Sequence, residues 1–360
     1  MARTTRKQGK KKGGSCLSRG CLVLFVLLLV PAGMAAWAWW TLHRPYQGYT
    51  GRERLVTIDP GMGASPALAR LESAGVLADA RLARLYLISF FGNRPIQAGE
   101  YRFSGPLDTE QVLRKLVRGE VVAHSVTLVE GMTLEEAAGK LAEAQLGRLE
   151  TFLGLMRSPE LIADLDPDAR DLEGYLFPET YAFARGTGEK AIVATLVKTF
   201  RERFALHVQP LLARRPGRSV RQTVTLASIV EKEAKAAAER PLIAGVYSNR
   251  LARRIGLAAD PTVIYALKRL GRWNGNIRKA DLQIDSPYNT YRYAGLPPGP
   301  ICSPGLASLT AAADPADVPY LYFVSRNDGT HVFASTLEEH NRNVDLWQRQ
   351  YWRERRRPLH

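Results

Sequence analysis

A long stretch without charge near the N-terminus constrains this chain more than any other feature. Between Arg19 and His43 lie 23 residues that carry no charged side chain, GCLVLFVLLLVPAGMAAWAWWTL. About 20 apolar residues are enough for an α-helix to cross the roughly 30 Å hydrocarbon core of a bilayer. The sequence therefore predicts a single transmembrane helix at residues 21–42.

The flanks of this stretch predict its orientation. Residues 1–20 hold seven lysines and arginines and no acid, whereas three tryptophans stand at the opposite end. Basic residues favour the cytoplasmic side of a membrane, and indole rings favour its headgroup layer. We expect a cytoplasmic basic arm at 1–20, a single pass through the cytoplasmic (inner) membrane, and an extracytoplasmic remainder. The alternative, a cleaved signal peptide, is disfavoured because the tryptophans occupy the place of a small-residue cleavage site.

The remaining composition excludes several classes of protein. The net charge of +15 includes +7 from the short arm, so a basic surface for nucleic acid is not indicated. Cys302 is the only cysteine after the apolar stretch, which means that the extracytoplasmic part depends on its hydrophobic core and has no internal disulfide. The histidines and cysteines lack the spacing of metal ligands, and no glycine-rich phosphate loop follows a strand. We expect no metal and no other cofactor.

An internal repeat with an offset of 70 residues follows. VTIDPGMGASPALARLESAGVL (56–77) aligns with VTLVEGMTLEEAAGKLAEAQLG (126–147), and each copy predicts a strand, a glycine turn and an amphipathic helix. Thr133 and Glu136 have the spacing of a capping box. With the second strand and helix expected near 98–121, these units resemble LysM-type carbohydrate-binding modules. We assign residues 43–155 to a LysM-like module region, which either binds glycan or only holds the next domain off the membrane.

Residues 156–360 predict a mixed α+β catalytic domain, because longer helices alternate with Pro- and Gly-rich connections and one hairpin signal. In the segment ASIVEKEA, a helical projection places Glu233 inside the apolar stripe, between Leu226 and Ile229, and Glu231 on its flank. Apolar surroundings raise the pKa of a carboxyl group, so that it stays protonated near neutral pH, as a general acid must. The alternative is a structural pair with an arginine across a helix interface.

A series of long motifs surrounds this helix. In chain order they are EGYLFPETY, ASIVEKEA, ERPLIAGVYSNRL, ADPTVIYAL, SPYNTYRYAGLPPGPICSPG and ADPADVPYLYFVSRNDGTHVFA. Together with the N-terminal anchor they resemble the endolytic murein transglycosylase family (MltG/YceG-like), and the likeness covers nearly all of the chain after the apolar stretch. It implies a lyase that cuts the bond between MurNAc and GlcNAc in nascent peptidoglycan strands without water. The muramyl C6 hydroxyl attacks C1 and leaves a 1,6-anhydro end.

The resemblance also implies roles for single residues. The second glutamate of the EKE triplet, Glu233, corresponds to the catalytic acid/base of the family, and one carboxyl group suffices because the substrate supplies the nucleophile. Glu231 then has a supporting role, in a structural ion pair. Asp260, which precedes Pro261, is expected to cap a helix. The candidates for contact with the glycan lie within the motifs: Glu173, Tyr175, Glu179, Asp260, Asn289 and Tyr291.

Two other functions remain open. A glycoside hydrolase would use Glu233 with a second acid such as Glu173, and would release reducing ends. A peptidoglycan-binding scaffold without catalysis would be unaffected by Glu233→Gln. The expected partners are peptidoglycan glycan strands and the membrane, with peptidoglycan synthases as candidate protein partners and no nucleic acid.

Overall fold

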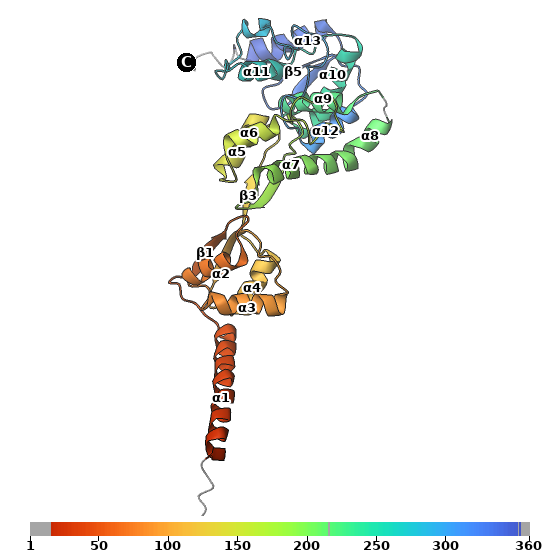
Figure 1. The fold of residues 1–360 in the computed structure, drawn as a ribbon. Helices are drawn as coiled ribbons and strands as arrows, with labels where there is room; N and C mark the ends of the chain where they lie inside the picture. Colours follow the sequence, from red (N-terminus) through yellow and green to blue (C-terminus); the bar gives the residue numbers. More distant parts are fainter. Residues whose placement is uncertain (1–15, 215–216, 352, 354–360) are drawn as a thin grey trace, which may run out of the picture. The chain divides into compact units, whose positions relative to one another are not determined.

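The computed structural model describes residues 16–214, 217–351 and 353. The chain forms two compact units (Figure 1), the first comprising Met1–Val122 with Ala184–Gly186 and the second comprising Ala123–Phe183 with Thr187–His360. Helices predominate, and the described strands pair into two-stranded sheets. The mixed α+β class predicted from the sequence is confirmed.

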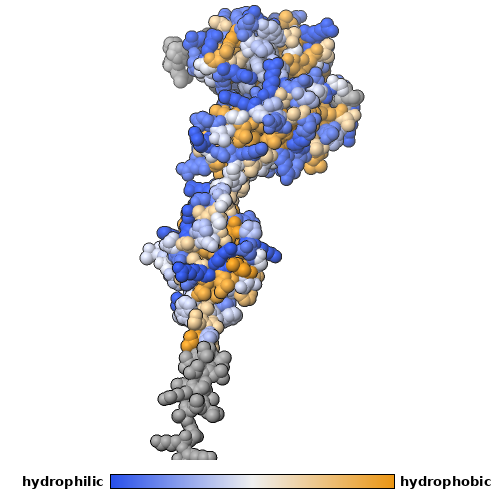
Figure 2. Space-filling view, in the orientation of Figure 1, coloured by the Kyte–Doolittle hydropathy of each residue, from blue (hydrophilic) through white to orange (hydrophobic). Residues whose placement is uncertain are grey.

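The first unit is a small sheet covered by helices. Its elements are α1 (Cys16–His43), β1 (Glu53–Ile58), α2 (Ala64–Ser73), α3 (Ala80–Phe91), β2 (Gly99–Ser104) and α4 (Thr109–Arg118). β1 and β2 pair antiparallel, with Val56 opposite Tyr101. Leu68, Leu87 and Leu113 meet in a core of its own. Figure 2 shows apolar side chains between hydrophilic ones on the surface of this unit.

The predicted membrane segment, 21–42, falls within α1. The first 15 residues of the basic arm and the side chains of residues 16–28 lie outside the described part of the chain. Over the residues that are described, no helix has the length and apolar character that a bilayer crossing requires. The transmembrane anchor therefore stays a prediction from the sequence.

The second unit is mostly helical (Figure 1). Its strands are β3 (Ala123–Thr127) with β4 (Thr180–Ala184), and the predicted hairpin of β5 (Tyr322–Ser325) and β6 (His331–Ala334). The helices are α5 (Leu134–Glu143), α6 (Leu149–Met156), α7 (Glu189–Arg203), η1 (Phe204–Val208), α8 (Gln209–Arg214), α9 (Val220–Glu233), η2 (Ala237–Glu239), α10 (Arg240–Ala252), α11 (Asp260–Arg269), η3 (Asp281–Gln283), α12 (Leu306–Ala313), α13 (Leu337–Val344) and η4 (Asp345–Gln350). α9 packs against α10, α11 and α12, which makes it the central helix of this unit.

The two copies of the internal repeat fold alike. The order β1–α2–α3–β2 matches β3–α5–α6–β4, and in each copy the two strands pair. The turn glycines Gly61 and Gly131 have φ angles of 80° and 81°, in the left-handed region that favours glycine. The predicted capping box of Thr133 and Glu136 is present. The repeat is thus confirmed in structure, whereas LysM-type glycan binding stays a prediction.

The second copy belongs to the second unit, although the sequence pattern assigned both copies to one region at 43–155. Leu141 of α5 and Phe152 of α6 lie in the same hydrophobic core as Ile229 of α9. The compact units accordingly divide at 122/123 rather than at the expected boundary of 155/156. The pattern of a repeat predicts which face of a helix is apolar, but not which neighbour covers that face.

Candidate active site

α9 holds Glu233 at the end of a buried helix. The helix begins at a capping box formed by Ser219 and Gln222, and it ends where Ala234 becomes extended. The stretch from Thr223 to Val230 is buried without interruption, so the last turn is firmly anchored. Glu233 lines a surface pocket of about 340 Å³. The other residues of this pocket are Tyr247, Arg250, Leu257, Ala258, Asp260, Tyr291, Tyr322, Phe323 and His340.

The surroundings of Glu233 favour its protonated form. The Tyr247 hydroxyl donates a hydrogen bond of 3.1 Å to Glu233 Oε1. Burial of the carboxyl group raises the pKa of Glu233 to about 7, although the bond from Tyr247 lowers it, and the charge of Asp260 raises it further. The side chain keeps partial access to the pocket. A group with this pKa can both donate and accept a proton near neutral pH.

Two of the residues expected to contact the glycan, Asp260 and Tyr291, line this pocket. The Tyr291 hydroxyl donates a hydrogen bond of 2.6 Å to Asp260 Oδ1. The prediction that Asp260 caps its helix is wrong, because Ala259 is the N-cap of α11 and no side chain caps it. The Asp260 carboxylate is therefore directed to Tyr291 and the pocket rather than to the helix backbone.

The other polar and aromatic residues that line the Glu233 pocket were not singled out from the sequence. Tyr247 lies on α10, the α-helix that follows α9 in the chain, and belongs to the motif ERPLIAGVYSNRL. The guanidinium of Arg250 lies 5.3 Å from the ring centroid of Tyr322, which stacks on His340 at 5.1 Å. Burial, and then the charge of Arg250, lowers the pKa of His340. The sequence signal for Tyr247, Arg250 and Tyr322 is their place in the motifs, because no spacing rule links α10 to the distant strand β5.

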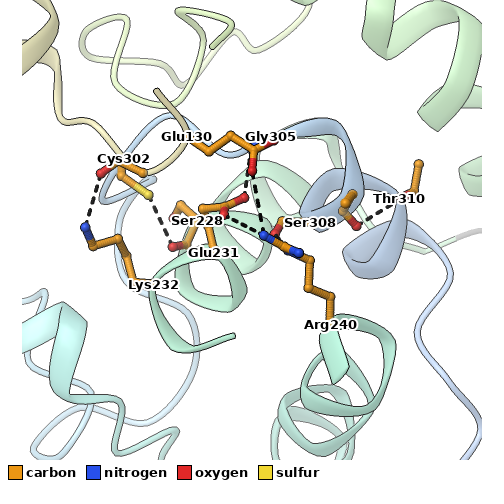
Figure 3. A network of polar contacts seen from close by, with 11 residues as sticks. Glu130, Ser228, Glu231, Lys232, Arg240, Cys302, Gly305, Ser308 and Thr310 are labelled. Atoms are coloured by element: carbon orange, nitrogen blue, oxygen red, sulfur yellow. Dashed lines mark hydrogen bonds and ion pairs between the residues drawn. The ribbon is translucent and has the colours of Figure 1, made fainter. Parts of the chain in front are cut away.

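Glu231 lies two residues from Glu233 but in a different environment (Figure 3). Glu231 Oε1 accepts from the Arg240 guanidinium at 3.1 Å, and Oε2 accepts from the backbone N–H of Gly305 at 2.9 Å. The Glu231 side chain is only 5% exposed. Arg240 also contacts Glu130 at 3.7 Å and donates to the Ser308 hydroxyl at 3.0 Å. Glu231 therefore joins α9, the start of α10 and the loop before α12.

The turn of the second repeat packs against this network. Lys232 Nζ donates to the Gly131 carbonyl at 3.2 Å, and the N–H of Gly131 donates to the Ser303 carbonyl at 2.9 Å. The Cys302 thiol, buried in the same loop, donates to the Ser228 carbonyl at 3.3 Å. Because these contacts hold Lys232 and Ser228 of α9, they restrict how the end of this helix can move.

Glu173 and Tyr175 lie away from the Glu233 pocket and are buried. Glu173 is 3% exposed and accepts from the N–H of Leu134, the first residue of α5, at 3.1 Å and from the Tyr265 hydroxyl at 3.1 Å. Burial raises the pKa of Glu173 to about 8, despite the lowering effect of the Leu134 bond. Tyr175 is 1% exposed and donates to Asp166. Its ring is enclosed by the core, so it cannot stack on a sugar.

Glu179 and Asn289 have structural partners. Both carboxylate oxygens of Glu179 accept from Arg203 at 3.3 Å. Asn289 is fully buried: its amide donates to the carbonyls of Leu282 and Ile284, and its oxygen accepts from the N–H of Tyr291. The amide of Asn289 thus shapes the loop that presents Tyr291 instead of meeting an N-acetyl group.

The pocket combines one carboxyl group of near-neutral pKa with a nearby carboxylate and several aromatic rings. Such a set suits proton transfer on a sugar substrate, because tyrosine rings and hydroxyls contact sugar faces and hydroxyl groups. Within the described ranges, no three His, Cys, Asp or Glu side chains are placed to hold a metal ion. The raised pKa of Glu233 and its access to the pocket suit it to acid–base chemistry.

Comparison with known proteins identifies the family to which the chain belongs. The YceG-like family matches residues 56–346. The chain belongs to this family. The endolytic murein transglycosylase of Bacillus subtilis is 32% identical over 303 residues, which are 80% of this chain and 82% of the relative. That of Streptococcus pneumoniae is 32% identical over 321 residues, which are 80% of this chain but 57% of the relative.

A solved structure agrees with the family assignment. The crystal structure of a YceG-like protein from Listeria monocytogenes has a TM-score of 0.56 and 33% sequence identity, and the match covers 81% of this chain and 99% of that one. The resemblance seen in the sequence motifs is confirmed. The YceG-like match begins within β1 of the first unit and includes the whole Glu233 pocket.

Proposed function

We propose that this YceG-like chain is an endolytic lytic transglycosylase, a lyase that cleaves the MurNAc–GlcNAc bond of nascent peptidoglycan strands and leaves 1,6-anhydro-MurNAc ends. The observation that carries the proposal is Glu233, a carboxyl group whose pKa is raised to about 7 at the surface of an aromatic pocket. The relatives from Bacillus subtilis and Streptococcus pneumoniae are named endolytic murein transglycosylases. The name of these relatives supports peptidoglycan as the substrate, and the Glu233 pocket supports acid–base chemistry.

The proposed reaction needs one proton-carrying group. Protonated Glu233 donates its proton to the glycosidic oxygen, the bond from that oxygen to C1 of MurNAc breaks, and GlcNAc leaves with a new hydroxyl. The C6 hydroxyl of the same MurNAc then bonds to C1 and returns its proton to the Glu233 carboxylate. No water is consumed, and the enzyme ends in its starting protonation state.

Two neighbours tune this proton transfer. The bond from Tyr247 stabilises the carboxylate that forms after the first step, whereas the negative charge of Asp260 favours the protonated starting form. Asp260 also stands where it can stabilise positive charge that develops on the sugar ring, as an oxocarbenium-like transition state requires. The proposal gives Glu231 a supporting role, because its ion pair with Arg240 joins α9 to α10, the helix that carries Tyr247.

A two-carboxylate hydrolase is the second candidate, because Asp260 lines the same pocket as Glu233. Glu173 is a poor second acid, since it lines other hollows and already accepts two hydrogen bonds. The products decide between the reactions: anhydro ends indicate intramolecular attack, and reducing ends indicate attack by water. A scaffold without catalysis would give neither.

The experiment is mass spectrometry of glycan fragments after the full chain, in detergent, has acted on uncrosslinked peptidoglycan strands. We expect internal fragments with 1,6-anhydro ends from the wild type and none from Glu233→Gln. Reducing ends would favour the hydrolase. Retained binding without cleavage by the wild type would favour the scaffold.

We further propose that residues 21–42 anchor the chain in the cytoplasmic membrane, with the arm at 1–20 inside and the rest outside. The support is the uncharged stretch and its asymmetric flanks. This location would bring the enzyme close to peptidoglycan synthases, which are the candidate protein partners. Protease treatment of spheroplasts tests the topology: the region after residue 43 should be digested while an epitope on the arm is protected.

A further inference from the structure

A second group of hollows in the same unit is not used by the reaction proposed above. One hollow of about 390 Å³ and a neighbour of about 350 Å³ share four lining residues, Arg170, Asp171, Glu173 and Arg269. Neither hollow shares a lining residue with the Glu233 pocket. We call this pair of hollows the Arg269 pocket.

Helix α11 connects the Arg269 pocket with the site of proton transfer. Asp260, its first residue, lines the Glu233 pocket, and Arg269, its last residue, lines the second one. Nine residues of helix, at 1.5 Å each, separate the two ends by about 13 Å. A side branch of a polymer in the Glu233 pocket would have to span at least about this distance to enter the Arg269 pocket.

The Arg269 pocket presents guanidinium groups without carboxylate partners. Arg269 is held against two aromatic rings, with its guanidinium carbon 5.8 Å from the Tyr265 centroid and 5.5 Å from the Tyr288 centroid. Among the described residues, neither Arg269 nor Arg170 forms an ion pair within 4 Å. Arg269 Nη1 also donates a long hydrogen bond of 3.5 Å to the Tyr288 hydroxyl. A guanidinium has five N–H donors, so others can still bind a carboxylate.

Glu173 at the base of this pocket adds a neutral polar group rather than a negative charge. Its burial, at 3% exposure, favours the protonated form. The Glu173 carboxyl group accepts hydrogen bonds from the Tyr265 hydroxyl and from the Leu134 N–H. Its O–H group, when protonated, can donate to a carbonyl group of a ligand. Asp171 supplies the one negative charge shared by both hollows. A ligand with a carboxylate, a carbonyl and amide N–H groups matches this set, because its N–H groups can donate to Asp171 while its carboxylate meets the arginines.

We propose that the Arg269 pocket binds the stem peptide of the peptidoglycan strand, with Arg170 and Arg269 on a peptide carboxylate. The proposal rests on the proposed function, because it takes the glycan of the Glu233 pocket as the polymer that carries the peptide. It assigns the pocket a role in substrate selection: strands that still bear peptides bind more tightly than bare glycan.

Binding of uncut strands tests the proposal without depending on cleavage. The full chain carrying Glu233→Gln, in detergent micelles, is titrated with glycan strands that bear stem peptides and with the same strands after an amidase has removed the peptides. We expect the parent to bind the peptide-bearing strands about tenfold more tightly, as one charge-assisted contact provides. Adding Arg170→Gln and Arg269→Gln should abolish this difference by weakening only the binding of peptide-bearing strands.

Arg118→Gln is the matched control, because Arg118 is likewise the exposed last residue of a helix, α4 in the first unit. It should leave the difference between the two strands intact. Equal affinity of the parent for both strands would overturn the proposal, as would equal losses on both strands in the arginine variants, which would indicate contact with the glycan itself. Arg170→Gln alone, at an exposed position, keeps the test valid if the Arg269 variant misfolds. Failure of the wild type to cleave any strand would count against the transglycosylase and not against this pocket.

Discussion

Glu233 and Glu173 are two glutamates of one unit whose pKa values are both raised but whose surroundings differ. Each accepts a hydrogen bond of 3.1 Å from a tyrosine, Tyr247 for Glu233 and Tyr265 for Glu173, and burial raises the pKa to about 7 and about 8. Glu173 also accepts from the N–H of Leu134 and is almost fully enclosed. Glu233 has no backbone donor among its described partners and reaches a pocket.

The difference shows that a raised pKa does not identify a catalytic acid by itself. Burial favours the protonated form of both side chains, but of the two only Glu233 keeps an oxygen that accepts no hydrogen bond from the described residues. Both oxygens of Glu173 accept hydrogen bonds that stabilise the start of α5 and fix Tyr265 on α11. Exposure and an oxygen that is free to accept, rather than the pKa, distinguish the two side chains.

The largest expected effect is the loss of catalysis in Glu233→Gln. The amide cannot donate and then recover a proton, so the rate of strand cleavage should fall by about 10²- to 10⁴-fold. Release of anhydro-ended fragments measures this rate. The control is Glu179→Gln, whose parent side chain pairs with Arg203 outside the Glu233 pocket. Cleavage at the wild-type rate by Glu233→Gln would contradict the proposed proton transfer by Glu233.

The same comparison predicts a loss of stability at the other glutamate. Glu173→Ala leaves the N–H of Leu134 and the hydroxyl of Tyr265 without a buried acceptor, and should lower the free energy of unfolding of the second unit by about 3 kcal/mol. Glu233→Gln keeps an acceptor for Tyr247 and should change this free energy by less than about 1 kcal/mol. Urea unfolding, followed by tryptophan fluorescence, measures both. Equal losses would mean that Glu233 is also a structural residue.

Stability should also depend on pH through Glu173. Its pKa is about 8 in the folded chain, against 4.5 for an unburied glutamate, so between these values the folded chain holds a proton that the unfolded chain has lost. The free energy of unfolding should therefore fall as pH rises from about 4.5 to 8, by about 1.4 kcal/mol per pH unit for this proton. In Glu173→Gln the free energy of unfolding should depend less steeply on pH, because the contribution of this one proton is missing. An unchanged slope would assign the titration to other groups.

The sequence predicted one of these glutamates far better than the other. The helical projection and the EKE motif both selected Glu233, because a buried helix imposes a period that can be read from its own residues. Glu173 and Asn289 were predicted to contact glycan, yet both are buried. Glu173 binds Tyr265, which lies 92 residues away, whereas Asn289 binds residues of its own loop. Tyr247 was missed because it meets Glu233 only through the packing of α10 against α9. Motifs identify residues that matter, but tertiary contacts decide whether a polar group faces the pocket or the core.

The smallest expected effect concerns how the pKa of Glu233 is set. The charge of Asp260 raises this pKa and the bond from Tyr247 lowers it, so Asp260→Asn and Tyr247→Phe should shift it in opposite directions. Since Glu233 must be protonated to start the reaction, kcat/KM should fall at lower pH in Asp260→Asn than in the wild type, and at higher pH in Tyr247→Phe. The pH profiles of strand cleavage measure both shifts. Profiles that coincide with the wild type would show that burial alone governs Glu233, as it dominates Glu173, and that the two glutamates differ only in access.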